Sequence, residues 1–439
     1  MPGPFVIPVR GDEDFPAEVD VVVVGAGIVG ASTALELAEA GLRVALSDKG
    51  GVGQEQSSRN LGWIRMTQRD PREIPLMAES LRIWANLDRR TGRDTGFNQC
   101  GLVFIESSEK KLTRHLQWYK NLEGYQLTSQ VLSPSQLTDL IGPHGVENAG
   151  AFYSPYDCRA EPQKATSAIA EAARKKGAFV LTECAVRGFE TTNGKITAAI
   201  TERGTIKCRS LVVAAGGWTN LFLRRHNIDL PQVNVRSTLL RTYPVAGAPN
   251  QNLNTDEFGW RKRDDGGYSI GGGLWRTDLV PNSFRYLTRF LPFTTTRAVN
   301  LSFGATFFKE MMTSKNWSMD DKSPFEYERV ADPTPVSGTD ELLVKVAKRF
   351  PAFANARIKQ RWAGYVDFTP DAVPTLSAID QVSGLHVATG MSAHGFGIGP
   401  GAGRLMADLV TGRTPIVDPT PFRFSRFADG TPMRPIKTL

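Results

Sequence analysis

Residues 21–48 read VVVVGAGIVGASTALELAEAGLRVALSD, and this stretch decides the fold. Its four valines predict a buried strand, which the glycine-rich turn Gly25-Ala-Gly27-Ile28-Val29-Gly30 follows directly. Residues 31–42 then space alanine and leucine as an amphipathic helix does. A second apolar run ends at Asp48. Residues 21–48 therefore predict one strand–helix–strand unit with an acid at the end of its second strand.

The three glycines meet the physical demands of a bound dinucleotide. Gly25 permits a tight turn, Gly27 lets the backbone approach a pyrophosphate, and Gly30 lets the helix pack closely on the strand. The helix N-terminus would face the phosphates. Asp48 is placed to accept a hydrogen bond from a ribose hydroxyl. FAD and NAD share this pattern, so the turn alone predicts a dinucleotide without choosing between them.

Composition excludes several classes of protein. The 439 residues are 41% hydrophobic and 22% charged, which is typical of a globular chain with two or three domains. The net charge is +7, but the basic residues are scattered among acidic ones and form no block, so we expect no nucleic-acid partner.

Cysteine and histidine usage predicts neither a disulfide framework nor a metal site. The four cysteines are widely spaced: Cys100, Cys158, Cys184 and Cys208. Four of the five histidines show no spacing typical of metal ligands: His115, His144, His226 and His386. The N-terminal residues lack the apolar core of a signal peptide, and no run reaches the roughly 18 apolar residues of a membrane span. We therefore expect reduced thiols and a cytoplasmic location.

The predicted elements alternate between two domains along the chain. Helices are predicted over 72–92, 109–122 and 160–177, and strands over 100–106, 150–155, 178–186 and 211–219. Strands are also predicted within 233–280, and a strand, a glycine-rich loop and a helix over 385–411. The expected cofactor domain is discontinuous, and the other domain uses the intervening segments. The cofactor domain comprises 18–94, 156–232 and 346–420, the substrate domain 95–155 and 233–345, and a C-terminal tail 421–439.

Two further segments suit a long cofactor. Residues 49–65 form a loop rich in small residues after the second strand. Residues 394–403, HGFGIGPGAG, form a second glycine-rich turn before a helix, which again offers backbone amides and a helix dipole to negative charge.

At these residues the sequence resembles the D-amino-acid oxidase, glycine oxidase and sarcosine oxidase family of FAD-dependent amine oxidoreductases. The similar segments follow the family's order: 25–41, Ser57-Ser58, 160–173, 211–219, 362–374 and 390–400. The resemblance implies an α/β fold, in which a Rossmann-like doubly wound FAD domain is interleaved with a mainly antiparallel substrate domain. It also implies oxidation of a substrate C–N bond by hydride transfer to flavin N5, followed by hydrolysis of the imine, with no catalytic dyad.

The family's cofactor contacts carry over residue by residue. Glycines 25, 27 and 30 would contact pyrophosphate, Asp48 the ribose, Val186 the adenine, and 395–398 the N1/C2-carbonyl end of the flavin. The full set implied is Gly25, Gly27, Ile28, Val29, Gly30, Asp48, Lys49, Ser57, Ser58, Asn60, Leu61, Gly62, Val186, Ala214, Ala215, Gly216, Gly395, Phe396, Gly397 and Ile398.

The sequence departs from members of the family at four places. Gly364 stands where some relatives tether FAD through cysteine, and the 57–63 loop has no histidine, so we expect non-covalent FAD. Val366 replaces an arginine that grips the substrate carboxylate in glycine oxidase relatives, and Gly397 replaces a lysine of sarcosine oxidases. Either another cation binds the carboxylate, or the substrate is an amine without one.

Six residues are candidates for the substrate site, each with a plainer structural alternative. Three are cations that could replace the missing anchor, and the others are an ammonium binder, a polar group beside the flavin and an aromatic wall. In that order they are Arg65, Arg241 and Arg276, then Asp367, His394 and Trp63. The alternatives are a phosphate or interdomain contact for Arg65, an ion pair or solvated edge for Arg241 and solvent exposure for Arg276. For the others they are a turn for Asp367, a helix cap for His394 and core packing for Trp63.

Residues 284–317 combine aromatics and methionines with arginine and lysine. We favour a helix pair packed on the substrate-domain sheet, because the apolar spacing suits a buried face. A lid, or a surface that contacts a membrane or redox partner, is the alternative.

The sequence thus predicts an FAD-dependent enzyme that deaminates an amino acid, with oxygen or a quinone-type carrier as electron acceptor. Alternatives are a dehydrogenase or demethylase of an N-substituted amine, an NAD(P)H-dependent flavin hydroxylase, and a flavin-binding protein without turnover. The location is cytoplasmic, with contact to the inner face of a membrane through 284–317 as an open alternative. Neither the enantiomer nor the oligomeric state follows from the residues.

Overall fold

A six-stranded sheet carries the glycine-rich turn. The computed structural model describes residues 3–125, 127, 129–294 and 300–435. The sheet is parallel except for its edge strand β19. In spatial order its strands are β19 (Thr375–Ala378), β20 (Leu385–Thr389), β12 (Ser210–Val213), β1 (Val21–Val24), β2 (Val44–Ser47) and β8 (Phe179–Leu181).

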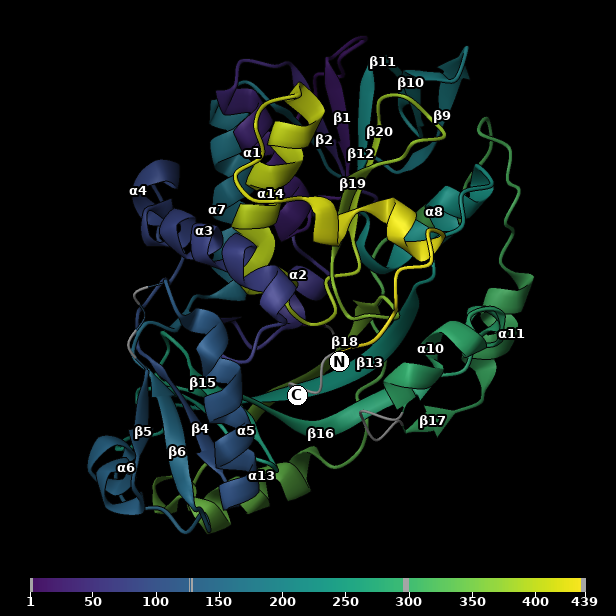
Figure 1. The fold of residues 1–439 in the computed structure, drawn as a ribbon. Coiled ribbons are helices and arrows are strands. Elements are labelled where there is room, and N and C mark those ends of the chain that lie inside the picture. Colours follow the sequence, from purple (N-terminus) through teal and green to yellow (C-terminus); the bar gives the residue numbers. More distant parts are fainter. Residues whose placement is uncertain (1–2, 126, 128, 295–299, 436–439) are drawn as a thin grey trace.

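Helices cover one face of this sheet, and a small sheet covers the other (Figure 1). On the first face α1 (Ile28–Glu39) packs against α7 (Pro162–Lys175) and α14 (Gly395–Thr411), and α14 packs against α3 (Ile74–Ala85). On the other face the valines of β1 share a core with a meander and α8 (Thr219–Arg225). The meander strands are β9 (Val186–Thr192), β10 (Lys195–Thr201) and β11 (Gly204–Lys207).

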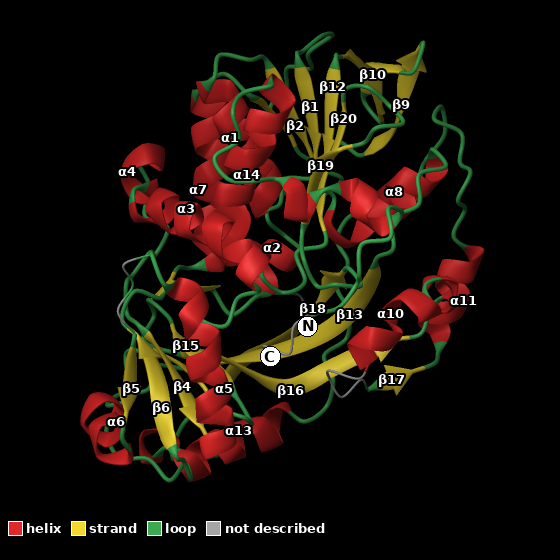
Figure 2. Cartoon of the chain, viewed as in Figure 1, coloured by secondary structure: helices red, strands yellow, loops and turns green. Residues whose placement is uncertain are grey.

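The second sheet has nine strands and is mainly antiparallel (Figure 2). Only β4 with β14 and β16 with β17 pair in parallel among the described strands of this sheet. Its strands in spatial order are β18 (Ile358–Phe368), β13 (Val233–Thr242), β16 (Tyr268–Asp278), β15 (Gly259–Lys262), β14 (Asn252–Asn254), β4 (Leu102–Glu106), β6 (Gly150–Ser154) and β5 (Gln130–Leu132), with β17 (Leu301–Ser302) beside β16. The Rossmann-like fold interleaved with an antiparallel sheet is therefore confirmed.

The remaining elements are short. The two-stranded ladder pairs β3 (Trp63–Ile64) with β7 (Cys158–Arg159). The other helices are α2 (Gln56–Arg59), α4 (Leu87–Thr91), α5 (Glu109–Tyr119), α6 (Pro134–Ile141), α9 (Pro281–Arg285), α10 (Leu287–Thr294), α11 (Ala305–Met312), α12 (Pro324–Tyr327) and α13 (Thr339–Arg349). Single 3₁₀ turns are η1 (Pro71–Glu73), η2 (Lys120–Leu122), η3 (Gly216–Trp218), η4 (Pro351–Phe353), η5 (Thr420–Phe422) and η6 (Phe424–Phe427).

Two expected boundaries differ from the structure. Strand β18 lies in the range 346–420, which we assigned to the cofactor domain, but it pairs along its length with β13 of the second sheet. The strand expected over 178–186 is two strands, because Glu183 adopts φ +47° and the chain turns there. The backbone amide of Cys184 then donates to the backbone carbonyl of Asp48 at 2.7 Å.

The segment 284–317 does not pack as we expected. Helix α11 has no buried residue, and eight large apolar side chains of the segment are exposed by 48% to 76%. These residues, the insertion surface, are Phe284, Leu287, Leu291, Leu301, Phe303, Phe308, Met311 and Met312. The expected buried helix pair is therefore wrong for the described residues, and no described helix is long and apolar enough to cross a bilayer.

Candidate functional site

A cavity of about 1120 Å³ runs between the two sheets. Its walls come from the glycine-rich turn, the loop after β2, strands β13, β16 and β18, and the N-terminus of α14. One end extends to β4 and α5, and another to residues of 279–301. The volume and the walls suit a cofactor together with a substrate.

The glycine-rich turn leaves no room for side chains. Gly25 has φ +100°, and a Cβ on it would lie 2.5 Å from the carbonyl oxygen of Ala214. A Cβ on Gly30 would lie 1.9 Å from the carbonyl oxygen of Gly25. The backbone amide of Ile28 donates to the Ser57 hydroxyl at 2.8 Å, so the next loop is tied to the start of α1. The turn thus exposes backbone to the cavity, as a pyrophosphate requires.

Asp48 follows β2 and links two loops at the cavity wall. Its carboxylate accepts from the backbone amides of Ala26 at 2.7 Å and Gly50 at 2.8 Å. Burial raises the pKa of this carboxyl, although both amides act to lower it. An ionised carboxylate has about four acceptor positions, so capacity remains for a ribose hydroxyl.

Most of the expected cofactor residues lie on one cavity wall, and three do not. Gly30, Ser58 and Ile398 are absent from the lining, and each packs behind it. The expected residues that line the cavity are Gly25, Gly27, Ile28, Val29, Asp48, Lys49, Ser57, Asn60, Leu61, Gly62, Val186, Ala214, Ala215, Gly216, Gly395, Phe396 and Gly397. No cysteine of the described chain lines the cavity, and the four cysteines are buried elsewhere.

The N-terminus of α14 brings a second set of backbone groups to the cavity. Ser392 and Ala393 precede it with φ +48° and +71°, a conformation that costs energy in residues other than glycine. His394 occupies the N-cap position but makes no side-chain capping hydrogen bond. It is 6% exposed, and its Nδ1 atom lies 3.0 Å from Glu73. Burial lowers the pKa of His394 to about 4, so the imidazole is neutral at pH 7.

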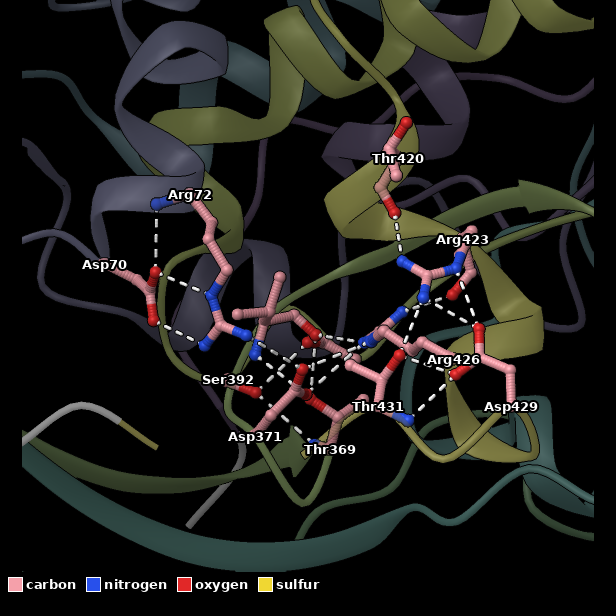
Figure 3. A network of polar contacts seen from close by, with 12 residues as sticks. Asp70, Arg72, Thr369, Asp371, Ser392, Thr420, Arg423, Arg426, Asp429 and Thr431 are labelled. Carbon is pink, nitrogen blue, oxygen red and sulfur yellow. Dashed lines mark hydrogen bonds and ion pairs between the residues drawn. The ribbon is translucent and has the colours of Figure 1, made fainter. Parts of the chain in front are cut away.

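A buried ion-pair network lies next to this turn (Figure 3). Asp371 is fully buried, and Arg426 from the C-terminal tail donates to it at 3.2 Å and to the carbonyl of Val373 at 2.8 Å. Arg72 also reaches Asp371, at 3.5 Å, and pairs with Asp70 at 2.8 Å. The tail that we expected to lie outside both domains is therefore packed against the loop that supports the strained turn.

The structure separates the six substrate candidates. Arg65, Trp63, Asp367 and His394 line the cavity, whereas Arg241 and Arg276 do not. Arg276 is exposed, because its neighbour Trp275 occupies the cavity face of β16.

Asp367 is already used structurally. One of its carboxylate oxygens accepts from the side chains of Gln232 at 2.8 Å and Thr389 at 3.1 Å, and from the amide of Gly390 at 2.7 Å. These bonds hold the end of β20, whereas the other oxygen, Oδ1, is buried without a hydrogen-bond partner in the described chain, so ammonium binding by Asp367 stays open.

Sequence reasoning missed the polar end of the cavity. Gln68, Glu106 and His115 line it, although we assigned no partner to His115. The one signal was position: His115 lies between Leu112 and Trp118 on the buried face of α5. Its partner Glu106 lies on a strand, so no local spacing connected the two.

Comparisons with known proteins agree with this geometry. A family model described as "DAO: FAD dependent oxidoreductase" matches residues 20–409. The solved structure of L-amino acid deaminase from Proteus myxofaciens, in complex with anthranilate, is 32% identical with a TM-score of 0.93, and 97% of each chain is covered.

Two curated relatives are more distant. Glycine oxidase from Pseudomonas aeruginosa is 25% identical over 92% of this chain and 97% of its own length. Mouse mitochondrial sarcosine dehydrogenase is 23% identical over 97% of this chain, which spans only 43% of that protein. The match to the family model covers most of the chain, and the chain belongs to the DAO family of FAD-dependent oxidoreductases.

Proposed function

We propose that this protein oxidises the C–N bond of an L-α-amino acid, giving an imine that water hydrolyses to a 2-oxo acid and ammonia. The observation that carries the proposal is one continuous cavity that joins the glycine-rich turn to Arg65. The 32% identity to an L-amino acid deaminase favours the L enantiomer. That structure holds anthranilate, which carries both an amino group and a carboxylate.

The residues present fit FAD, which supplies hydride acceptance when bound. The backbone of 25–29 and Asp48 would hold its adenosine and pyrophosphate, and the α14 N-terminus would face the flavin. Because His394 is neutral, it would add no positive charge at the N-terminus of α14. Arg69 lies 3.2 Å from Glu73 and balances the negative charge of that carboxylate. We propose non-covalent attachment, because Gly364, which lines the cavity where tethered relatives carry a cysteine, has no side chain to form the bond.

Arg65 is the proposed carboxylate anchor. Arg65 is 6% exposed and lines the cavity. It directly follows residues 57–64, part of the loop that we expect to run along the cofactor. A guanidinium can grip a carboxylate through two parallel hydrogen bonds, which a lysine cannot reproduce.

Anaerobic bleaching of the flavin spectrum tests the function. We expect L-amino acids to reduce the flavin, D-enantiomers and sarcosine to act far more slowly, and Arg65→Lys to lower kcat/KM by ~10- to 100-fold. Arg241→Gln is the matched control, because Arg241 does not line the cavity, and should leave kcat/KM unchanged. Bleaching by N-methylated amines alone would favour an amine dehydrogenase, rapid bleaching by NADPH a hydroxylase, and no bleaching a flavin-binding protein without turnover.

The exposed insertion surface favours a carrier at a membrane as electron acceptor over free oxygen. Large exposed apolar patches mark interaction sites in soluble proteins. Leu287 and Leu301 belong to this surface and also line the cavity. We therefore propose a cytoplasmic protein that contacts a membrane surface through 284–312. Oxygen uptake compared with reduction of a quinone analogue tests the acceptor.

A further inference from the structure

Glu106 is an acidic group at the polar end of the cavity without a cationic partner. It ends β4, lines the cavity, and has a side chain only 10% exposed. One oxygen lies 2.9 Å from Nδ1 of His115. Within the described residues, no lysine or arginine lies within ion-pair distance of Glu106, and its other oxygen accepts no hydrogen bond. A largely buried carboxylate normally has a charged partner.

His115 orients this carboxylate without neutralising it. The imidazole stacks on Phe152 with ring centroids 4.0 Å apart and meets Phe104 and Trp118 edge-on. It is 1% exposed, and burial lowers its pKa, although the hydrogen bond to Glu106 and the charge of that carboxylate act to raise it. A neutral ring that donates from Nδ1 fixes one oxygen of Glu106 and leaves the other available to a ligand.

Gln68 completes the polar end. Its side-chain amide lies 2.9 Å from Nδ1 of His115. The atom at that distance is the amide nitrogen Nε2, which donates, so Nδ1 donates to Glu106 only when the Gln68 amide is turned to place its oxygen against the ring. The backbone of Gln68 adopts φ +55°, which costs energy in a residue other than glycine and is typical of functional sites. The strained backbone holds this amide beside the His115–Glu106 pair and at the cavity wall.

The other charges near this end leave a place for a cation. Lys111 lines the cavity but pairs with Asp256 at 2.6 Å. Arg114 also contributes to the lining, but it lies on the exposed side of α5, where solvent screens its charge. Arg65, which donates to the carbonyl of Thr67, would also meet the substrate carboxylate if the proposed function holds. The negative charge of Glu106 is then unbalanced at this end of the cavity.

We propose that Glu106, oriented by His115, binds a cationic nitrogen at the end of the substrate side chain. The enzyme then prefers basic amino acids, those that end in an amino or guanidino group, over apolar amino acids of the same length. This inference rests on the proposed function, because it takes the bound molecule to be an α-amino acid whose carboxylate meets Arg65.

The test compares pairs of substrates that differ only in the terminal nitrogen. Rates of anaerobic flavin reduction are measured for L-lysine against L-norleucine and for L-ornithine against L-norvaline, because the length that fits is itself an outcome. We expect kcat/KM to favour the cationic member of one pair by at least ~10-fold. In Glu106→Gln this ratio should fall by ~10- to 100-fold.

Glu109→Gln is the matched control for this substitution. It removes an exposed carboxylate at the start of α5, outside the cavity lining. The change in net charge is the same as in Glu106→Gln, so a general effect of charge on cationic substrates would appear in both variants. We expect the ratio of the two substrates to stay at the wild-type value in Glu109→Gln.

Non-reacting ligands separate this inference from the proposed function. The carboxylic acids 6-aminohexanoate and hexanoate lack an α-amine, so their binding to the holoenzyme is measured without turnover, by perturbation of the flavin spectrum. We expect the first to bind at least ~10-fold more tightly, and this preference to disappear in Glu106→Gln. His115→Phe keeps the aromatic packing and should weaken the preference in part.

The outcomes are distinct. A preference for 6-aminohexanoate without flavin reduction by any amino acid would overturn the proposed function and support the cation subsite. Flavin reduction by amino acids with no preference for the cationic members would overturn the subsite alone. Equal losses for lysine and norleucine in Glu106→Gln would also overturn it, because Glu106 would then act on the part that both substrates share.

Discussion

The two ends of the cavity are lined by different groups: backbone at the cofactor end and side chains at the substrate end. The cofactor end is walled by backbone, where glycines at 25 and 27 and the amides of 395–397 face the cavity. The substrate end is walled by side chains from β4, α5, 279–290 and 300–301, which lie far apart in the sequence. A backbone wall tolerates few residue types and leaves a pattern in the sequence, whereas a side-chain wall can be built in many ways.

The sharpest way to break the backbone wall is Gly30→Ala. Its Cβ would lie 1.9 Å from the carbonyl oxygen of Gly25, and two backbone segments would have to separate to relieve that contact. We expect loss of bound flavin and destabilisation by more than about 4 kcal/mol. Flavin absorbance of the purified protein and urea unfolding measure both effects.

Gly412→Asn is the control for this substitution. Gly412 ends α14 with φ +68° and open space around it, and asparagine tolerates that conformation. Normal flavin content in Gly30→Ala would contradict the close packing of α1 on β1.

The same contrast explains what the sequence predicted. The 21–48 unit, the helix at 162–175 and the strand at 210–213 follow from local periodicity, and the structure confirms them. The Glu106–His115 pair could not be predicted, because a strand and a helix meet there through tertiary packing alone. The exposure of the insertion surface was missed for a related reason: apolar spacing indicates which face of a helix is apolar, but not whether anything covers it.

Arg426→Gln tests whether the C-terminal tail supports the cofactor end. The substitution leaves the fully buried Asp371 with the Val373 amide at 3.3 Å and with Arg72 at 3.5 Å as its remaining cation in the described chain. Breaking a buried pair in this way costs about 3 kcal/mol. We expect lower stability in urea and a shifted flavin spectrum, with partial rescue by Arg426→Lys.

Arg423→Gln is the matched control for the tail, because Arg423 pairs with Asp429 at the surface. It should leave the Tm essentially unchanged. Equal effects of the two substitutions would show that the tail acts through packing and not through the buried pair.

The pH dependence of stability tests His394 at the boundary between the two ends. Its pKa is lowered to about 4 by burial, below the unfolded value of about 6.5, so the unfolded chain binds the proton first. The stability that this residue contributes is present above pH 6.5 and is lost as the pH falls toward 4. Between pH 7 and pH 5 the wild type should lose about 2 kcal/mol more than His394→Asn. Urea unfolding at both pH values measures this difference, and parallel losses would contradict a neutral buried imidazole.

Substitutions in the insertion surface, on the outer side of the substrate end, should have the smallest effect on the fold. Phe308 and Met312 are exposed, so Phe308→Ser with Met312→Ser should change stability by less than about 0.5 kcal/mol and leave the flavin spectrum as it is. Co-sedimentation with anionic phospholipid vesicles should nevertheless fall, because apolar side chains anchor a protein at the interface. Val344→Ser, an exposed apolar position on α13, is the matched control and should sediment as the wild type does. Unchanged sedimentation of the double variant would contradict membrane binding through the insertion surface. The exposed apolar side chains would then favour contact with another protein.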